Sequence, residues 1–174
     1  MRYAIISDIH ANFDAFETVL KDIDASQIDR TVCLGDVVGY GAQPRECIAA
    51  LREREILTIA GNHDYAAIGK TNINYFNAYA KEATLWTRKV CTEEDKNWLK
   101  SLSLVEYLED FTMVHGTLYA PELFDYILSL SDADPSLDEM TRPVCFVGHS
   151  HIPLTVMRFV EDPGRTAYTC DTEA

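Results

Sequence analysis

The chain has 174 residues, 47% of them hydrophobic, which is the size and composition of one globular domain spanning residues 1–174. Its formal net charge is −13, from 15 basic and 28 acidic residues, so binding to long nucleic acids is disfavoured. No apolar stretch is long enough to span a membrane, and the N-terminus lacks a secretory signal. The five cysteines contain no CxxC pair. We therefore expect a cytoplasmic protein with buried thiols and no membrane association.

Apolar strands alternate with amphipathic helices in the first half of the chain. Strands are predicted at residues 3–6, 31–34 and 56–60, because each is a short apolar run that ends in polar or glycine-containing residues. Helical spacing of apolar residues predicts a helix over 13–24, and Pro44 suits the first turn of another.

The second half is helical first and then rich in strands. A helix is predicted by one face of apolar residues, formed by Tyr75 or Phe76, Tyr79, Ala83, Trp86 and Val90, and Thr92 with Asp95 can cap the next helix. Strands follow at 104–108, 111–114 and 144–147, and a hairpin pairs 154–160 with 166–170 around Asp162-Pro163-Gly164. Residues 121–130 are expected to form a short helix, and 132–142 a surface loop or a turn of helix. The order of elements indicates an α/β domain.

Every histidine of the chain lies at the end of a predicted apolar strand. The segments are Asp8-Ile9-His10, Gly61-Asn62-His63-Asp64, His115-Gly116 and Gly148-His149-Ser150-His151, and Asp36 of Gly35-Asp36 holds the matching place after the second strand. The carboxyl ends of strands that share a sheet meet at one edge, where α/β proteins bind ligands. We therefore expect these side chains to line one crevice.

The residue types in this crevice suit metal binding. In an extended segment residues i and i+2 point the same way, so Asp8 with His10, and His149 with His151, could present paired ligands. Imidazoles and carboxylates bind zinc, manganese, iron and nickel, and two ions about 3.5–4 Å apart can clamp a phosphoryl group. Each motif alone is explained equally well by a turn, a helix cap or a core histidine. Five motifs in order, using every histidine, favour a metal site.

Together the five motifs resemble the signature of the calcineurin-like metallophosphoesterase superfamily, D-x-H, G-D, G-N-H-[DE], H-G and G-H-[ST]-H. The resemblance covers residues 1 to about 153, and residues 39–47 look most like the small bacterial and archaeal phosphodiesterase branch. It implies a four-layer α-β-β-α sandwich of two mixed sheets flanked by helices. Relatives usually continue with more strands, whereas this chain ends 23 residues after His151, so we expect either a truncated chain or a naturally short variant.

The resemblance also implies the role of each residue. The site would hold two divalent metal ions, manganese in the first place, with iron, nickel or zinc as alternatives. The implied ligands are Asp8, His10 and His151 for the first ion, Asn62, His115 and His149 for the second, and Asp36 as the bridge. His63 would not bind metal but would stabilise the transition state or protonate the leaving alkoxide, and Asp64 would orient its neighbours.

The implied function is a phosphoesterase, foremost a phosphodiesterase, that hydrolyses a small phosphate ester by in-line attack of a metal-bridging hydroxide. The alternative is a non-catalytic protein-binding module on the same fold. A protein phosphatase is disfavoured, because the segment after Gly35-Asp36 lacks the Asp-Arg-Gly of those enzymes. A nuclease fits poorly with the acidic charge, and a homo-oligomer stays open. Tyr40 or Asn12 could contact substrate, while Arg45 is expected to be solvated.

Overall fold

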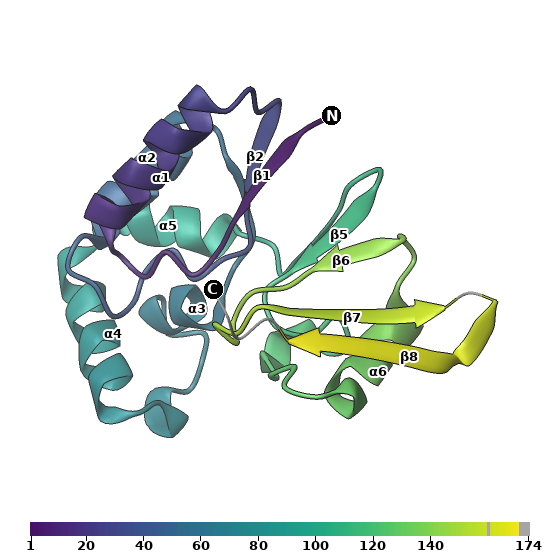
Figure 1. Cartoon of the computed structure of the whole chain (residues 1–174). Helices are drawn as coiled ribbons and strands as arrows, with labels where there is room; N and C mark the ends of the chain where they lie inside the picture. The colour runs from purple at the N-terminus through teal and green to yellow at the C-terminus, as the bar shows by residue number, and fades with distance from the viewer. Residues whose placement is uncertain (160, 171–174) are drawn as a thin grey trace.

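The first half of the chain forms a parallel sheet covered by helices on one face. This computed structural model describes residues 1–159 and 161–170, and Figure 1 shows its elements. The sheet has the order β1-β2-β3, with strands β1 (Tyr3–Ile6), β2 (Arg30–Cys33) and β3 (Leu57–Thr58). Its strands are joined by α1 (Phe13–Ala25) and α2 (Pro44–Glu53), the crossovers that parallel pairing requires. These helices and α5 (Glu93–Ser101) pack on the sheet through an apolar cluster that includes Phe16, Ile48 and Leu99.

A second sheet packs against the other face of the first. It has the order β4-β5-β6, with β4 (Val105–Tyr107) antiparallel and β6 (Val144–Phe146) parallel to β5 (Phe111–Val114). The core between the sheets brings Val32 and Ile59 of the first half together with Met113 of the second. The rings of Tyr3 and Phe111 meet edge to face at 4.9 Å across this interface. Both faces of the first sheet are therefore buried. The loops that follow the strands of the two sheets reach the same side of the molecule.

The remaining elements surround this pair of sheets. They are α3 (Asn62–Ala67), α4 (Ala78–Val90), α6 (Leu130–Glu139), the 3₁₀ turns Ile73–Tyr75 and Pro121–Leu123, and the antiparallel strands β7 (Leu154–Phe159) and β8 (Asp162–Cys170). Figure 1 shows α3 and α4 below the first sheet and α6 beside the β7–β8 hairpin. Among the described residues, no helix combines the length and apolar character needed to cross a membrane.

Most sequence expectations for the fold are confirmed. The chain is a mixed α/β structure with two sheets flanked by helices, although all pairings described for the first sheet are parallel and only the second sheet is mixed. Thr92 and Asp95 form the predicted capping box of α5. The thiols of Cys33, Cys47 and Cys91 are buried and unpaired, as expected.

Three local predictions are wrong. Residues 132–142 contain most of a ten-residue helix, α6, whose Ala133 and Ser136 are buried, and the predicted helix at 121–130 is only a 3₁₀ turn. The predicted turn at Asp162-Pro163-Gly164 lies instead within β8, and the pairing register shifts between Arg158 and Phe159 of β7. Val160 of the predicted strand lies outside the described residues.

The aromatic face of helix α4 lies at the surface of the molecule. Ala80, Thr84 and Thr87 are the buried residues of α4, whereas the side chains of Tyr79 and Trp86 are exposed. Small side chains let α4 approach its neighbours closely, and Arg88 donates two hydrogen bonds to the Ala66 carbonyl of α3. The periodicity therefore predicted the helix correctly, and the structure shows that its core-facing residues are the small ones.

Candidate metal centre

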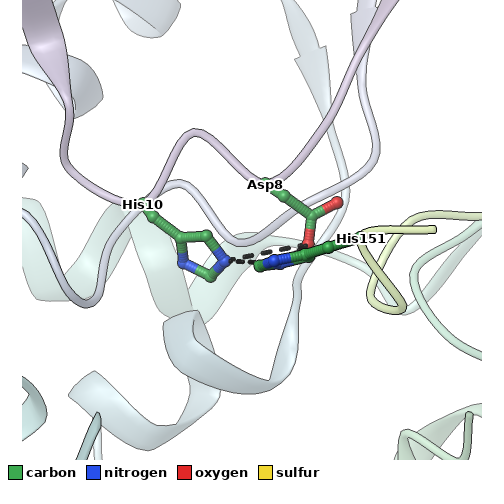
Figure 2. A group of neighbouring side chains, drawn as sticks. All are labelled: Asp8, His10 and His151. Carbon is green, nitrogen blue, oxygen red and sulfur yellow. Dashed lines mark hydrogen bonds and ion pairs between the residues drawn. The ribbon is translucent and has the colours of Figure 1, made fainter. Parts of the chain in front are cut away.

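Loops that follow strands of both sheets bring the predicted ligands together. Figure 2 shows the first group, in which Asp8 and His10 follow β1 and His151 follows β6. Their ligand atoms all lie within 4.8 Å of one another. The Asp8 carboxylate is 3.2 Å from His151 Nε2 and 3.8 Å from His10 Nε2, and the two imidazole nitrogens are 3.0 Å apart. Two nitrogens and one oxygen thus converge on one point.

A second group lies deeper in the same crevice. Asp36, His115 and His149 are all buried, and their ligand atoms again lie within 4.8 Å of one another. His115 Nδ1 donates a hydrogen bond to the Leu34 carbonyl at 2.8 Å, because a carbonyl can only accept. In the neutral ring this bond fixes the tautomer, so that Nε2, which lies 3.2 Å from Asp36 Oδ2, carries the lone pair that could bind a metal ion.

Asp36 lies between the two groups. Its Oδ1 accepts a hydrogen bond of 2.8 Å from the backbone N–H of His63, and its Oδ2 is 3.2 Å from His115 and 3.8 Å from His10. Asp36 also forms a third group of potential ligands with His10 and His63. A carboxylate held by one oxygen and shared by imidazoles on two sides is arranged to bridge two cations.

The backbone of these loops is left-handed at most of the ligand positions. The φ angles are 53° at Asp8, 49° at His10, 50° at Asp36, 67° at His149 and 54° at His151. Such conformations are uncommon outside glycine and cluster at functional sites, where the surrounding structure enforces them. The argument that an extended backbone pairs these residues is therefore wrong. Asp8 and His10 do meet, but His149 and His151 join different groups.

Buried atoms without hydrogen-bond partners show that the pocket fits metal ions. Asn62 Oδ1, His115 Nε2 and His149 Nε2 are inaccessible to solvent and make no hydrogen bond. Orphaned buried polar atoms are costly unless a ligand satisfies them. Asn62 begins α3 next to His63, and its amide oxygen, like the imidazoles and carboxylates, is a suitable donor for a divalent ion.

The electrostatics keep most imidazoles in the neutral form that metal binding needs. Burial lowers the pKa of His63 and of His149 to about 4, and it also lowers the pKa of His10. At His115 burial has the same tendency, but the charge of Asp36 outweighs it and raises the pKa to about 9. Burial opposes ionisation of Asp36, yet the charge of His115 holds the pKa of that carboxyl well below its usual range.

His63 and Asp64, the two predicted catalytic residues, have different surroundings. The His63 ring faces the centre, 4.9 Å from the ring of His10, and its Nδ1 is buried without a partner. Asp64 is fully buried, with Oδ1 accepting from Val38 N–H at 3.1 Å and Oδ2 from Gly61 N–H at 2.9 Å. Both of its oxygens thus accept hydrogen bonds from backbone amides of two different loops, and its predicted orienting role stays a prediction.

Two aromatic residues that lie at the centre were not predicted there from the sequence. Tyr126 stacks on His149, with ring centroids 3.9 Å apart, and Phe76 lies 4.9 Å from the His63 ring. Neither is part of a motif, and no signal in the sequence separates them from ordinary core aromatics. The predicted Tyr40 is at the centre, 4.7 Å from His63, whereas Asn12 caps α1 and Arg45 pairs with Asp95 while staying largely exposed.

Comparisons with known proteins agree with this geometry. The profile of the calcineurin-like phosphoesterase family matches residues 1–165. Uncharacterized protein MJ0912 of Methanocaldococcus jannaschii is 40% identical over 156 residues, which cover 86% of this chain and 62% of that protein. A crystal structure of a metallophosphoesterase from Sphaerobacter thermophilus is 40% identical with a TM-score of 0.77, covering 91% of this chain and 63% of that one.

A more distant structure shares the fold. Hypothetical protein PH1004 from Pyrococcus horikoshii OT3 has a TM-score of 0.70 at 17% identity, covering 97% of this chain and 86% of that one. The chain spans 62% and 63% of the lengths of the two relatives that are 40% identical to it.

Proposed function

Because the chain belongs to the calcineurin-like phosphoesterase family, we propose that it is a metal-dependent phosphoester hydrolase that uses two divalent ions. The observation that carries the proposal is the shared position of Asp36, which lies in two different groups of potential ligands. Asp8, His10 and His151 would hold the first ion, Asn62, His115 and His149 would hold the second, and Asp36 would be shared by both. When bound, such ions supply an activated water and neutralise charge on the phosphoryl oxygens.

We assign His63 the role of assisting the departure of the leaving oxygen of the ester. Its ring lies beside the centre, and its backbone N–H donates a hydrogen bond to Asp36 Oδ1. The backbone is therefore held in place while Nδ1 of the side chain makes no hydrogen bond. An imidazole in this place can stabilise negative charge on the leaving alkoxide or donate a proton to it. Asp64 supports this arrangement from behind, through the amides of Val38 and Gly61.

We propose a diester as the substrate, because separate pockets lie beside Tyr40 and beside Tyr126. Tyr40 touches the His10 ring at 4.9 Å and lines a pocket of about 360 Å³, while Tyr126 stacks on His149 and lines one of about 380 Å³. A phosphodiester carries two organic groups on its phosphorus, and each pocket has room for one of them. A monoester would use only one of these pockets.

The proposal also covers the identity of the metal, the cellular compartment and the size of the substrate. Manganese is the first choice of metal, with iron, nickel or zinc as alternatives, since mixed imidazole and carboxylate ligands accept all four. The free buried thiols support a reducing, cytoplasmic compartment. The acidic charge of −13 favours a small phosphate ester over long nucleic acid.

Metal analysis combined with a diesterase assay tests this function. The purified chain is stripped of metal, reloaded with Mn²⁺ and assayed on bis-p-nitrophenyl phosphate. We expect two bound ions per chain and turnover that depends on them. A folded protein that binds the ions but hydrolyses neither a diester nor a monoester under any divalent metal would contradict the proposal. That result would favour the alternative, a non-catalytic protein-binding module.

A further inference from the structure

A pocket with an aromatic wall opens beside the metal centre, between the loop after β2 and helix α4. It has a volume of about 360 Å³, within the range typical of small-molecule sites. The loop contributes Tyr40, Gly41 and Ala42, and α4 contributes Tyr79, Glu82, Ala83 and Trp86. The α4 residues are spaced i, i+3, i+4 and i+7, so they lie on one face of the helix.

This face of α4 is not part of the core. Tyr79 is 82% exposed and Trp86 39%, whereas the residues that anchor α4 are small and lie on another side of the helix. Large aromatic side chains that gather at a pocket without being buried are typical of binding sites. Ala83 lies between Tyr79 and Trp86 on the helix and leaves space above the helix for a flat ligand.

Tyr40 connects the pocket to the reacting centre. Its ring lies 4.7 Å from the His63 ring and 4.9 Å from the His10 ring, and it also lines the pocket. The loop is held in place, because Gly41 N–H donates to the His10 carbonyl at 2.9 Å. A group attached to a phosphate at the centre would therefore enter this pocket past Tyr40.

The charged group of the pocket is the carboxylate of Glu82. Glu82 is exposed and makes no ion pair or hydrogen bond with any residue in the described part of the chain. An ionised carboxylate can only accept hydrogen bonds, so it selects a ligand edge that carries N–H donors. No Lys or Arg lines the pocket, so a further phosphate group would find no cation there.

We propose that this pocket binds the base of a nucleoside phosphodiester and prefers guanine to adenine. The inference rests on the proposed phosphodiesterase function and names the substrate class of that site. A purine ring can stack on the Tyr79 and Trp86 side chains. Guanine presents adjacent N1–H and N2–H donors, which match the two oxygens of Glu82, whereas the corresponding edge of adenine presents one donor beside an acceptor.

Fluorescence of Trp86 tests the pocket without any turnover. The chain has two tryptophans, so Trp98→Phe leaves Trp86 as the sole reporter. We expect guanosine to quench its emission with or without metal, and adenosine to bind more weakly. In the wild-type chain the same quenching should disappear on Trp86→Phe, which keeps the test valid if Trp98→Phe does not fold.

Substitution of Glu82 tests the base preference. Glu82→Gln should weaken guanosine binding about tenfold or more, because a charged acceptor is replaced by an amide that also carries donors, while adenosine binding changes less. Tyr75→Ala is the matched control, since Tyr75 is 90% exposed nearby and does not line the pocket. Absence of quenching by any nucleoside would overturn the proposal, as would quenching by tetramethylammonium instead, which would indicate a cation site.

Activity measurements distinguish the base pocket from the proposed hydrolase function on which it rests. The assay compares p-nitrophenyl guanosine 5′-phosphate with methyl p-nitrophenyl phosphate. We expect a lower KM for the nucleoside ester, and a loss of that advantage in Glu82→Gln. Hydrolysis of both esters with equal KM would overturn the base pocket alone. Guanosine quenching without hydrolysis of either ester would support the pocket and contradict the hydrolase function.

Discussion

At the scale of single residues, Asp36 shows how one side chain can belong to two groups of potential metal ligands. Its Oδ1 is held by the His63 backbone N–H, and its Oδ2 faces His115 at 3.2 Å. Gly61 makes this possible, because a Cβ at that position would collide with the Asp36 carboxylate. The carboxylate is thus fixed by groups that would remain in place if its charge were removed.

The first prediction concerns this charge. Asp36→Asn should lower the metal content from two ions to at most one per chain, because an amide is a poor bridge between cations. The fold should persist, since the amide oxygen can still accept from His63. Metal analysis by mass spectrometry measures the content, and circular dichroism monitors the fold. Asp110→Asn, on an exposed turn, is the control. A folded Asp36→Asn protein with two bound ions would refute the bridging role.

The second prediction concerns His63. His63→Ala should keep both ions, because the backbone N–H that holds Asp36 is unchanged. Turnover should fall by about 10²–10⁴-fold, the usual contribution of an acid or base in the transition state. Steady-state kinetics and metal analysis on the same sample check both parts. If the variant instead lost an ion, His63 would be a ligand, as its proximity to His10 and Asp36 would permit.

At the scale of elements, the site depends on contacts between loops that are far apart in the chain. Asp64, in the first turn of α3, accepts from Val38 after β2 and from Gly61 after β3. These bonds hold the two loops that carry Asp36 and His63. Burial and the Asp36 charge raise the pKa of Asp64 to about 7, and the hydrogen bonds from the two backbone amides offset part of this shift.

The third prediction follows from these two hydrogen bonds. Asp64→Asn can keep only one of them, because the amide nitrogen cannot accept from a backbone N–H. The free energy of unfolding should fall by about 1–3 kcal/mol, the cost of a buried unpaired donor. Urea denaturation monitored by tryptophan fluorescence measures it. Unchanged stability combined with a loss of turnover would assign Asp64 a direct catalytic role.

Elements with regular periodicity were predictable from the sequence. The strands before each motif and the helices α1, α2 and α5 follow from apolar spacing and capping residues such as Thr92. Helix α6 could not be predicted in this way, because most of its residues are polar, it contains Pro135, and only two of its residues are buried. Ser136 is one of them, and its hydroxyl accepts a hydrogen bond from the N–H of Leu118, 18 residues away, a contact that local patterns cannot reveal.

The site was predictable as a set of residues but not as a geometry. Each predicted ligand follows a strand, and the motif order is specific, so the sequence could indicate that these residues lie close together, as Asp8, His10, Asp36, His115, His149 and His151 do. The left-handed backbone at Asp8 and His10 could not, because it is enforced by hydrogen bonds to the loop after β2, such as His10 N–H to the Asp36 carbonyl. Phe76 and Tyr126 also depend on tertiary packing alone.

At the scale of the whole molecule, the candidate centre joins the two halves of the chain. Asp8, His10 and Asp36 come from loops of the first sheet, whereas His115, His149 and His151 follow strands of the second. The apolar core between the sheets is supplemented here by a cluster of polar groups, several of them buried without partners. Ions that bind to these groups would tie the sheets together and satisfy those atoms.

The last prediction is that metal stabilises the fold through this junction. An ion that binds only the folded state adds about 2.7 kcal/mol when its free concentration is 100 times its Kd. For a chain of this length that corresponds to a rise in Tm of roughly 5–10 °C. Differential scanning calorimetry with Mn²⁺ and with excess chelator measures the difference.

The acidic surface, with a net charge of −13, can also attract cations diffusely, so both samples contain the same high NaCl concentration. Asp36→Asn should show a much smaller shift, because its centre lacks the bridge. Equal shifts in both proteins would mean that the stabilisation comes from the acidic surface and not from the centre.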